Sequence, residues 1–308
     1  MNKKYKLLKD DCILYNEKFL YRIKALKDFG DVKAGDLGGY IEHEDNLSHV
    51  ENCWVYNKAK IYDNAKIYEN AKIYNNAHVC GFARVYGCAE VSDNARIYKN
   101  AKVYDDAIVY GNAWIYDNAE IFGYARVYGD AEIYGYALLY GDAKIHENAK
   151  VYQNATVYGC ARIFDNAHVY GFARVYDEAE VYDDARIYGN AKVYQNSTIY
   201  GCAEVYDHVE VHGYGRVHGD AIINKGNIIG EVSMPFKNIF QHQCENRVLT
   251  VVLTKNDEVL YTIGCQNNIT EKEFVGRIHN NDGGLKRNPH RYEYLRLISL
   301  IKDYFKGE

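Results

Sequence analysis

The residues best suited to bind a ligand lie near the end of the chain, in the stretch NDGGLKRNPHRYEYLR (281–296). Two glycines leave the backbone free to approach a bound group, and a helix is expected to begin near Pro289 or His290. Helix amino termini attract phosphate, and arginine can grip it with two hydrogen bonds. The stretch therefore predicts a site for a phosphate-bearing, nucleotide-like ligand, formed by Gly283, Gly284, Lys286, Arg287, His290 and Arg291. The spacing is not that of a Walker loop. The alternative is a solvated loop before a helix that starts with proline.

Histidines in the middle of the chain are the candidate general bases. None has an obvious carboxylate and positioning loop beside it in the sequence, as a catalytic base would need. We therefore interpret them as surface residues and predict no catalytic residue, with a base for acyl transfer as the alternative. The residues concerned are His78, His146, His168, His208, His212 and His218.

The eight cysteines are widely spread and form no CxxC pair, so they do not indicate a zinc site of the usual spacing. Irregular spacing also argues against metal binding by the two other candidate groups, His242 with Cys244, and Cys265 with His279 and His290. The sequence thus indicates no metal and no cofactor. Cysteine usage of this kind is typical of reduced thiols in a cytosolic protein.

Charge and hydropathy limit the partners. The chain of 308 residues has 37 basic and 42 acidic residues, a net charge of −5, which argues against general nucleic-acid binding. The beginning, MNKKYKLLKDDCILY, has no apolar core of signal-peptide length, and no later stretch approaches 18 apolar residues. We expect a soluble, cytoplasmic protein that does not contact membranes.

A six-residue repeat must position the histidines in the middle of the chain. An aliphatic residue recurs every six positions from Val55 to Ile223, and all 29 of these positions are Val, Ile or Leu. Four residues after each aliphatic residue stands a small one, which is Ala in 25 of the 28 slots from Ala59 to Ala221. A fixed short period is the signature of a solenoid.

Each repeat reads as a short strand followed by a corner. In A-K-I-Y, alternation places Ala and Ile inside and Lys and Tyr outside, and the next two residues are turn-formers that tolerate left-handed conformations. Cys88, Cys160 and Cys202 each stand second in such a corner pair, where we expect small residues to be tolerated. Three repeats make a triangular coil of 18 residues, and just over nine coils stacked at strand spacing make a rod about 45 Å long.

This pattern resembles the left-handed parallel β-helix of hexapeptide-repeat proteins, in which a small residue also follows the aliphatic one four positions later. The resemblance covers residues 55–223, supplies the handedness and implies a homotrimer. This chain differs in the slot after the aliphatic residue, where the family often has a small residue and this chain has Tyr in 21 of 28 cases.

Residues 18 apart lie in one column, so each face should carry a tyrosine ladder. One such column contains Tyr62, Tyr98, Tyr116, Tyr134 and Tyr152. Stacked aromatic rings stabilise neighbouring strands. An aromatic surface for a partner or another subunit is the alternative interpretation.

A longer repeat is superimposed on the short one. The segments that begin at Asn76 and Asn166 are near-copies offset by 90 residues, which is five whole coils, and His78 recurs as His168 on the same face. Such an offset indicates duplication of a block that preserves the phase of the prism.

The two ends have other patterns. Residues 1–54 should form a β cap, with a strand at 19–26 and a Gly-rich, then extended, segment at 29–42. Residues 224–308 predict a small ββαα domain: strands at 247–254 and 258–264 separated by a hairpin signal, a helix after a Thr cap at 270, and a helix at 290–305.

The N-terminal region resembles that of hexapeptide-repeat proteins from bacteria, phages and prophages, which are commonly labelled acyltransferases by analogy of fold. The C-terminal unit resembles small carboxy-terminal domains of phage proteins. The resulting hypothesis is a non-enzymatic, phage- or prophage-type binding protein that sequesters a nucleotide-like host signal or binds a host protein. The alternatives are an acyltransferase of the hexapeptide-repeat type and a purely structural rod.

Overall fold

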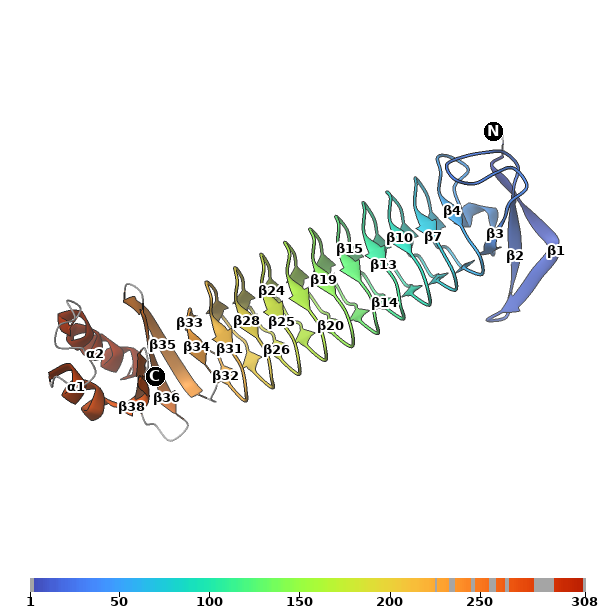
Figure 1. The fold of residues 1–308 in the computed structure, drawn as a ribbon. Helices are drawn as coiled ribbons and strands as arrows, with labels where there is room; N and C mark the ends of the chain where they lie inside the picture. Colours follow the sequence, from blue (N-terminus) through green and yellow to red (C-terminus); the bar gives the residue numbers. More distant parts are fainter. Residues whose placement is uncertain are drawn as a thin grey trace.

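The computed structural model describes residues 3–224, 226–232, 236–244, 247–254, 259–263, 266–279 and 291–306. The chain forms a straight rod of stacked coils, with the N-terminal strands at one end and a small unit of sheet and helices at the other (Figure 1). The rod is a parallel β-solenoid, which confirms the predicted fold class.

Each coil contributes one two-residue strand to each of three sheets, here named faces A, B and C. Face A contains β5 (Lys60–Ile61), β8 (His78–Val79), β11 (Arg96–Ile97), β14 (Trp114–Ile115), β17 (Glu132–Ile133), β20 (Lys150–Val151), β23 (His168–Val169), β26 (Arg186–Ile187), β29 (Glu204–Val205) and β32 (Ile222–Ile223). Face B contains β6 (Lys66–Ile67), β9 (Arg84–Val85), β12 (Lys102–Val103), β15 (Glu120–Ile121), β18 (Leu138–Leu139), β21 (Thr156–Val157), β24 (Arg174–Val175), β27 (Lys192–Val193), β30 (Glu210–Val211) and β33 (Asn227–Ile228). Face C contains β4 (Trp54–Val55), β7 (Lys72–Ile73), β10 (Glu90–Val91), β13 (Ile108–Val109), β16 (Arg126–Val127), β19 (Lys144–Ile145), β22 (Arg162–Ile163), β25 (Glu180–Val181), β28 (Thr198–Ile199), β31 (Arg216–Val217) and β34 (Glu231–Val232).

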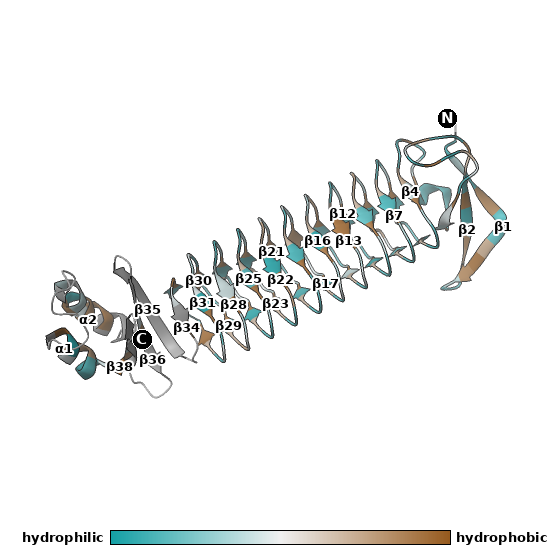
Figure 2. Ribbon diagram, in the orientation of Figure 1, coloured by the Kyte–Doolittle hydropathy of each residue, from teal (hydrophilic) through white to brown (hydrophobic). Residues whose placement is uncertain are grey.

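Two inward columns on every face build the core of the rod. The aliphatic residues from Val55 to Ile223 and the alanines that follow them are buried, as predicted from the alternation. Hydrophobic and hydrophilic residues accordingly alternate along each coil (Figure 2). Burial of one Val or Ile side chain stabilises the fold by about 1.5–3 kcal/mol, so this continuous column is the main apolar contribution of the rod.

Parallel hydrogen bonds fix the spacing between coils. Lys60 pairs with His78 and Ile61 with Val79, 18 residues on, and the same register recurs along the rod. The Lys60 amide, for example, donates to the carbonyl of Ala77 at 2.9 Å. Every residue of a coil therefore lies beside its counterpart 18 positions away in the sequence.

The corners require a left-handed residue, as the turn-formers predicted. The first corner residue of the coils has a positive φ, such as 57° at Asp63 and 72° at Gly135. A Cβ atom on Gly135 would lie 2.7 Å from the backbone nitrogen of Gln153 in the next coil. At several corners with Asp, Glu or Gln, the side chain accepts a hydrogen bond from the corner amide one coil on, as Asp63 Oδ2 does from Gly81 at 3.0 Å. These side chains satisfy amides that the strands leave unpaired.

The predicted aromatic ladders are present on all three faces. On face A, rings from Tyr98 to Tyr206 stack in series with centroid distances of 4.7–4.9 Å. On face B the series is longer and includes every coil from Tyr68 to His212. Burial in the ladder raises the pKa of Tyr152 to about 12, with further contributions from Tyr134 and Tyr170.

The coils continue past the strictly periodic residues at both ends. Near the start, Leu47 bridges to Ile67, and near the end β33 and β34 pair with β30 and β31. These pairings join Val211 to Ile228 and Val217 to Val232, so the sequence offset falls from 18 to 17 and then 15 residues. The hydrogen-bonded register persists because the shortening falls in the connections between strands.

An antiparallel hairpin begins the chain: β1 (Tyr5–Tyr15), which the sequence pattern did not predict, and β2 (Lys18–Ala25), close to the predicted strand. β3 (Leu37–Ile41) pairs antiparallel with β2 and parallel with β5, so it caps the exposed edge of face A. A short 3₁₀ helix, η1 (Glu44–Asn46), follows, and Tyr5 donates to the carbonyls of Glu44 and Leu47 at 2.7 and 2.8 Å.

The C-terminal unit contains a sheet and two helices within the described residues. The predicted hairpin is present as β36 (Arg247–Thr254) and β37 (Val259–Ile263). The sheet is wider than predicted, because β35 (Phe236–Cys244) and β38 (Gln266–Thr270) flank this pair. The helices are α1 (Glu271–His279) and α2 (Arg291–Lys306).

The predicted start of the first helix is confirmed in detail. Thr270 Oγ1 accepts the amide of Glu273 at 3.3 Å, and the Glu273 carboxylate accepts the Thr270 amide at 2.8 Å, which is a capping box. No helix in the described part of the chain is long and apolar enough to cross a membrane.

The ladders predict a measurable stability difference between two kinds of tyrosine. Tyr140 stacks on Phe122 and Tyr158, at 5.0 and 4.9 Å. Tyr140→Ala should lower the free energy of unfolding by about 1–3 kcal/mol, because two stacked pairs are lost. Tyr124→Ala, at an exposed corner position, should change it by less than about 0.5 kcal/mol. Urea unfolding followed by circular dichroism measures both, and equal losses would contradict a stabilising ladder.

Candidate functional site

The tip of the N-terminal hairpin lies over the first coils of face A and brings together residues that are far apart in the sequence. Tyr15, at the end of β1, contacts Tyr62 edge to face at 5.7 Å and His78 at 5.0 Å between ring centroids. Tyr62 is only 8% exposed beneath this cover. The cluster of Tyr15, Tyr62, His78 and Cys80 joins titratable side chains from two distant segments of the chain, and it is the candidate site.

Cys80 follows His78 by two residues, on the coil that Tyr15 contacts. It occupies the column in which the neighbouring coils carry Tyr62 and Tyr98, so the aromatic ladder of face A is interrupted there. Its thiol and the Tyr62 hydroxyl are hydrogen-bonded, and burial raises the pKa of the thiol. A protonated thiol is a poor nucleophile, so this cysteine is not activated for covalent chemistry.

His78 is held as a neutral imidazole. Its Nδ1 atom lies 3.0 Å from the Tyr15 hydroxyl. Burial lowers the pKa of His78 to about 4, and the positive charges of Lys60 and Arg96 add to the effect. A neutral ring with Nδ1 accepting from Tyr15 carries its own proton on Nε2. The contact thus takes up one of the two ring nitrogens of His78.

Ionic contacts hold the hairpin from the other side of its turn. Lys18, the first residue of β2, contacts Asp63 and lies 3.0 Å from Glu42, and the hydrogen bonds to Asp63 and then Glu42 raise its pKa. The same Glu42 carboxylate accepts the Asp63 amide at 2.7 Å. Tyr15 and Lys18 thus fasten both strands of the hairpin to the rod, and the cluster's clearest physical role is to hold this hairpin in place.

The duplicated position on face A has a different environment. His168 lies five coils from His78, between Lys150 and Arg186, and contacts Tyr152 edge to face at 6.0 Å. Burial lowers its pKa, and Lys150 and Arg186 lower it further. Tyr170 stands where Cys80 stands in the first copy, so the ladder is continuous there. The duplication therefore reproduces the imidazole without the neighbouring gap in the ladder.

The other candidate histidines have structural surroundings. His146 stacks between Tyr128 and Phe164 at 4.7 and 5.1 Å, and His212 and His218 stack on Tyr194 and Tyr200. His208 is at an exposed corner. Six residues that look alike in the sequence thus divide into ladder members, a corner residue and the two face A positions.

The predicted anion site cannot be compared with the structure. Gly283, Gly284, Lys286, Arg287 and His290 lie outside the described residues, as does Cys265. Arg291 is the first residue of α2, close to the predicted helix start. Cys88, Cys160 and Cys202 are free and exposed at their corners, as expected for tolerated residues.

Sequence reasoning missed Tyr15, Lys18 and the role of Cys80. One signal was available, since Cys80 and Ser92 are the positions where a column of rings is interrupted by a small side chain between Tyr56 and Tyr206. No local pattern specified that Tyr15, 63 residues before His78, would contact it.

Comparison with known proteins identifies the repeat. The family model for the YdcK beta solenoid repeat matches residues 101–117 and 185–201. A protein of Escherichia coli strain K12, "Uncharacterized acetyltransferase YdcK", is 46% identical over 39 residues, which are 13% of this chain and 12% of that protein. These matches and the parallel solenoid fit a β-helix family of the hexapeptide-repeat type, as predicted. The shared stretch is a small part of either chain and concerns the repeat rather than a complete protein.

The Tyr15–His78 contact predicts a pH-dependent stability. The pKa of His78 falls from 6.5 to about 4 on folding, so the unfolded chain binds more protons between these values. The contribution of neutral His78 to the free energy of unfolding is complete above about pH 6.5 and is lost as the pH falls towards 4. His78→Asn, which keeps an acceptor for Tyr15, should flatten the decrease in melting temperature over this range. An identical pH dependence in the variant and the wild type, measured by calorimetry, would contradict the assignment.

Proposed function

We propose that this β-solenoid of the hexapeptide-repeat type is a non-enzymatic binding protein whose rod acts as a rigid spacer. The observation that carries the proposal is the ladder of face B, in which stacked rings run through successive coils from Tyr68 to His212. A rod held by backbone hydrogen bonds, a packed core and stacked rings resists bending. It keeps the N-terminal hairpin and the C-terminal unit at a fixed separation of about 45 Å, by strand spacing.

The ligand of the proposed protein is a phosphate-bearing, nucleotide-like molecule bound near the start of α2. The support is chemical: Gly283 and Gly284 free the backbone, Lys286 and Arg287 supply positive charge, and His290 and Arg291 adjoin the helix start. The start of α2 at Arg291 supports this role for the preceding stretch. Sequestration of a host signal, a host protein partner, a homotrimer and a phage or prophage origin form part of the same proposal and rest on the sequence resemblance.

The anion site predicts a loss of binding on charge reversal. Arg287→Glu combined with Arg291→Glu should weaken binding of ATP, used as a nucleotide probe in calorimetry, by more than about tenfold, because two charge-assisted contacts are reversed. The matched control is Arg84→Glu with Arg174→Glu, two exposed arginines on the rod. Mass spectrometry of molecules released from the purified protein would identify a natural ligand. Equal binding by wild type and both double variants would rule out this site.

Acyl transfer is the second candidate function. It is favoured by the acetyltransferase name of the similar Escherichia coli protein and by the neutral imidazoles of His78 and His168 on face A. Of these, His168 is the better candidate base, because Tyr15 occupies Nδ1 of His78. A coupled assay of acetyl-coenzyme A turnover with amine and hydroxyl acceptors distinguishes the two functions. The binding proposal predicts no turnover. Turnover that His168→Ala abolishes and His208→Ala leaves intact would establish the acyltransferase instead.

A further inference from the structure

The ladder of face C has a gap at Ser92. Tyr74 precedes it by one coil and Tyr110 follows it by one coil. On the side away from the gap, Tyr74 stacks against Tyr56 at 4.6 Å and Tyr110 stacks against Tyr128 at 4.8 Å between ring centroids. Each ring next to the gap is therefore held in the ladder orientation by its own neighbour.

The gap has the width of one aromatic ring. Neighbouring rings elsewhere on face C stack at 4.7–5.1 Å. Tyr74 and Tyr110 are two coils apart, which is about 9.6 Å by strand spacing. A planar ring placed over Ser92 would thus lie at stacking distance from both tyrosines at once, without movement of either.

The gap in the ladder of face A, at Cys80, lies near a ring from a separate segment of the chain. Tyr15 contacts Tyr62 edge to face at 5.7 Å, and its hydroxyl lies 3.0 Å from Nδ1 of His78, two residues before the gap. On face C, the loop that carries Asp31 reaches Tyr56 and Lys72 through hydrogen bonds of 2.8 and 3.3 Å. These contacts lie on the coils before Ser92, and among the described residues no ring contact crosses the gap itself.

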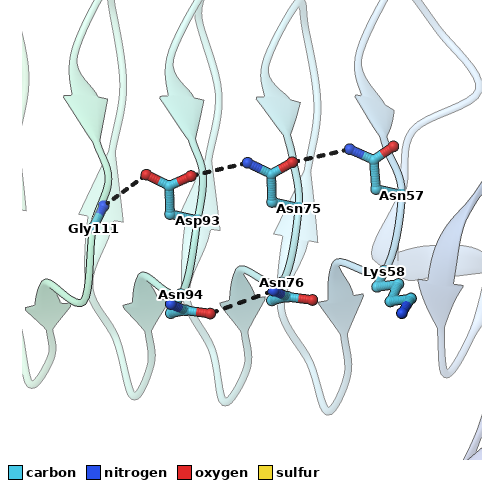
Figure 3. Close-up of a pocket in the computed structure, with 7 residues that line it drawn as sticks. All are labelled: Asn57, Lys58, Asn75, Asn76, Asp93, Asn94 and Gly111. Carbon is cyan, nitrogen blue, oxygen red and sulfur yellow. Dashed lines mark hydrogen bonds between the residues drawn. The ribbon is translucent and has the colours of Figure 1, made fainter.

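Acidic and amide groups border the gap. Glu90 is on β10, two residues before Ser92 and in register with Lys72 of β7, and no ion pair of Glu90 is among those of the described residues. At the adjoining corner, Asp93 accepts from Asn75 at 2.9 Å and from Gly111 at 3.2 Å. An open depression of about 540 Å³ lies at this corner. Its lining residues, drawn in Figure 3, are Asn57, Lys58, Asn75, Asn76, Asp93, Asn94 and Gly111. Two carboxylates beside a ring-sized gap favour an aromatic group that carries a positive charge nearby.

The chain itself displays aromatic groups of this kind. At five corners a Gly is followed by an aromatic residue whose side chain is 62–79% exposed: Phe82, Tyr124, Tyr136, Phe172 and Tyr214. Four of these are followed two residues later by an exposed arginine, namely Arg84, Arg126, Arg174 and Arg216. Exposed aromatic side chains with adjacent arginines are typical of protein interfaces.

We propose that the Ser92 gap is a docking site for a second copy of this chain, which inserts one of its exposed corner aromatics between Tyr74 and Tyr110. The arginine two residues beyond that ring then lies near Glu90 or Asp93. The sequence resemblance implies a homotrimer but assigns no surface to it. This inference assigns one, and it does not depend on the proposed anion site.

Substitution of the gap residue tests the proposal with the fold preserved. Ser92→Tyr should complete the ladder of face C and leave the melting temperature unchanged or higher, while closing the gap. Ser92→Ala removes the hydroxyl and keeps the gap open. Sedimentation velocity over a range of concentrations should show self-association of the wild type and of Ser92→Ala, and at least about tenfold weaker association of Ser92→Tyr.

A second variant tests the inserted ring. Replacement of Phe82, Tyr124, Tyr136, Phe172 and Tyr214 together by Ser should weaken association as much as Ser92→Tyr does, because these rings are exposed in the single chain. The proposal is overturned if the wild type is monomeric throughout, or if Ser92→Tyr associates like the wild type. It is also overturned if tyramine, used as a small cationic aromatic probe, binds at Ser92 in a protein that does not self-associate.

Discussion

The 18-residue register between coils is the constraint on which the rest of this structure depends. Parallel hydrogen bonds place each residue of the rod beside the residue 18 positions on. Every outward-facing side chain of the rod therefore belongs to a column. The environment of a residue is then set mainly by its column neighbours. The same constraint stacks the tyrosines, pairs the corner amides with side chains of the previous coil, and requires a left-handed residue at each corner.

Positions that break the pattern of a column are where the rod can make contacts that the other coils do not make. Cys80 interrupts the ladder of face A on the coil where Tyr15 contacts the partly buried His78. His168 shows the contrast: with Tyr170 in the column instead of a cysteine, the duplicated imidazole lies beside a continuous ladder. Binding surfaces on such a protein therefore follow from substitutions in a repeat, without any loop inserted between coils. This supports a binding role more directly than a catalytic one.

Much of the fold was predictable because periodicity is a local signal. The six-residue period predicted the inward columns from Val55 to Ile223, the corners and the ladders, and the Thr270 capping box predicted the start of α1. The pattern failed where structure depends on contacts between distant segments. The coils that contain Leu47 and Ile228 have irregular spacing, and β1 is defined by its pairing with β2. Of the candidate site, the sequence identified His78 as one of six similar histidines, and only the position of the hairpin distinguishes it.

Column neighbours decide what each position of the rod accepts, and the hairpin near Cys80 allows this rule to be tested directly. Hydrogen–deuterium exchange of residues 5–25 would be compared between Cys80→Tyr and Cys80→Ser. We expect that Cys80→Tyr completes the ladder from Tyr62 to Tyr98, displaces Tyr15 and speeds exchange in the hairpin, while exchange in the rod stays unchanged. Cys80→Ser should protect the hairpin like the wild type. Equal protection of the hairpin in both variants would contradict the claim.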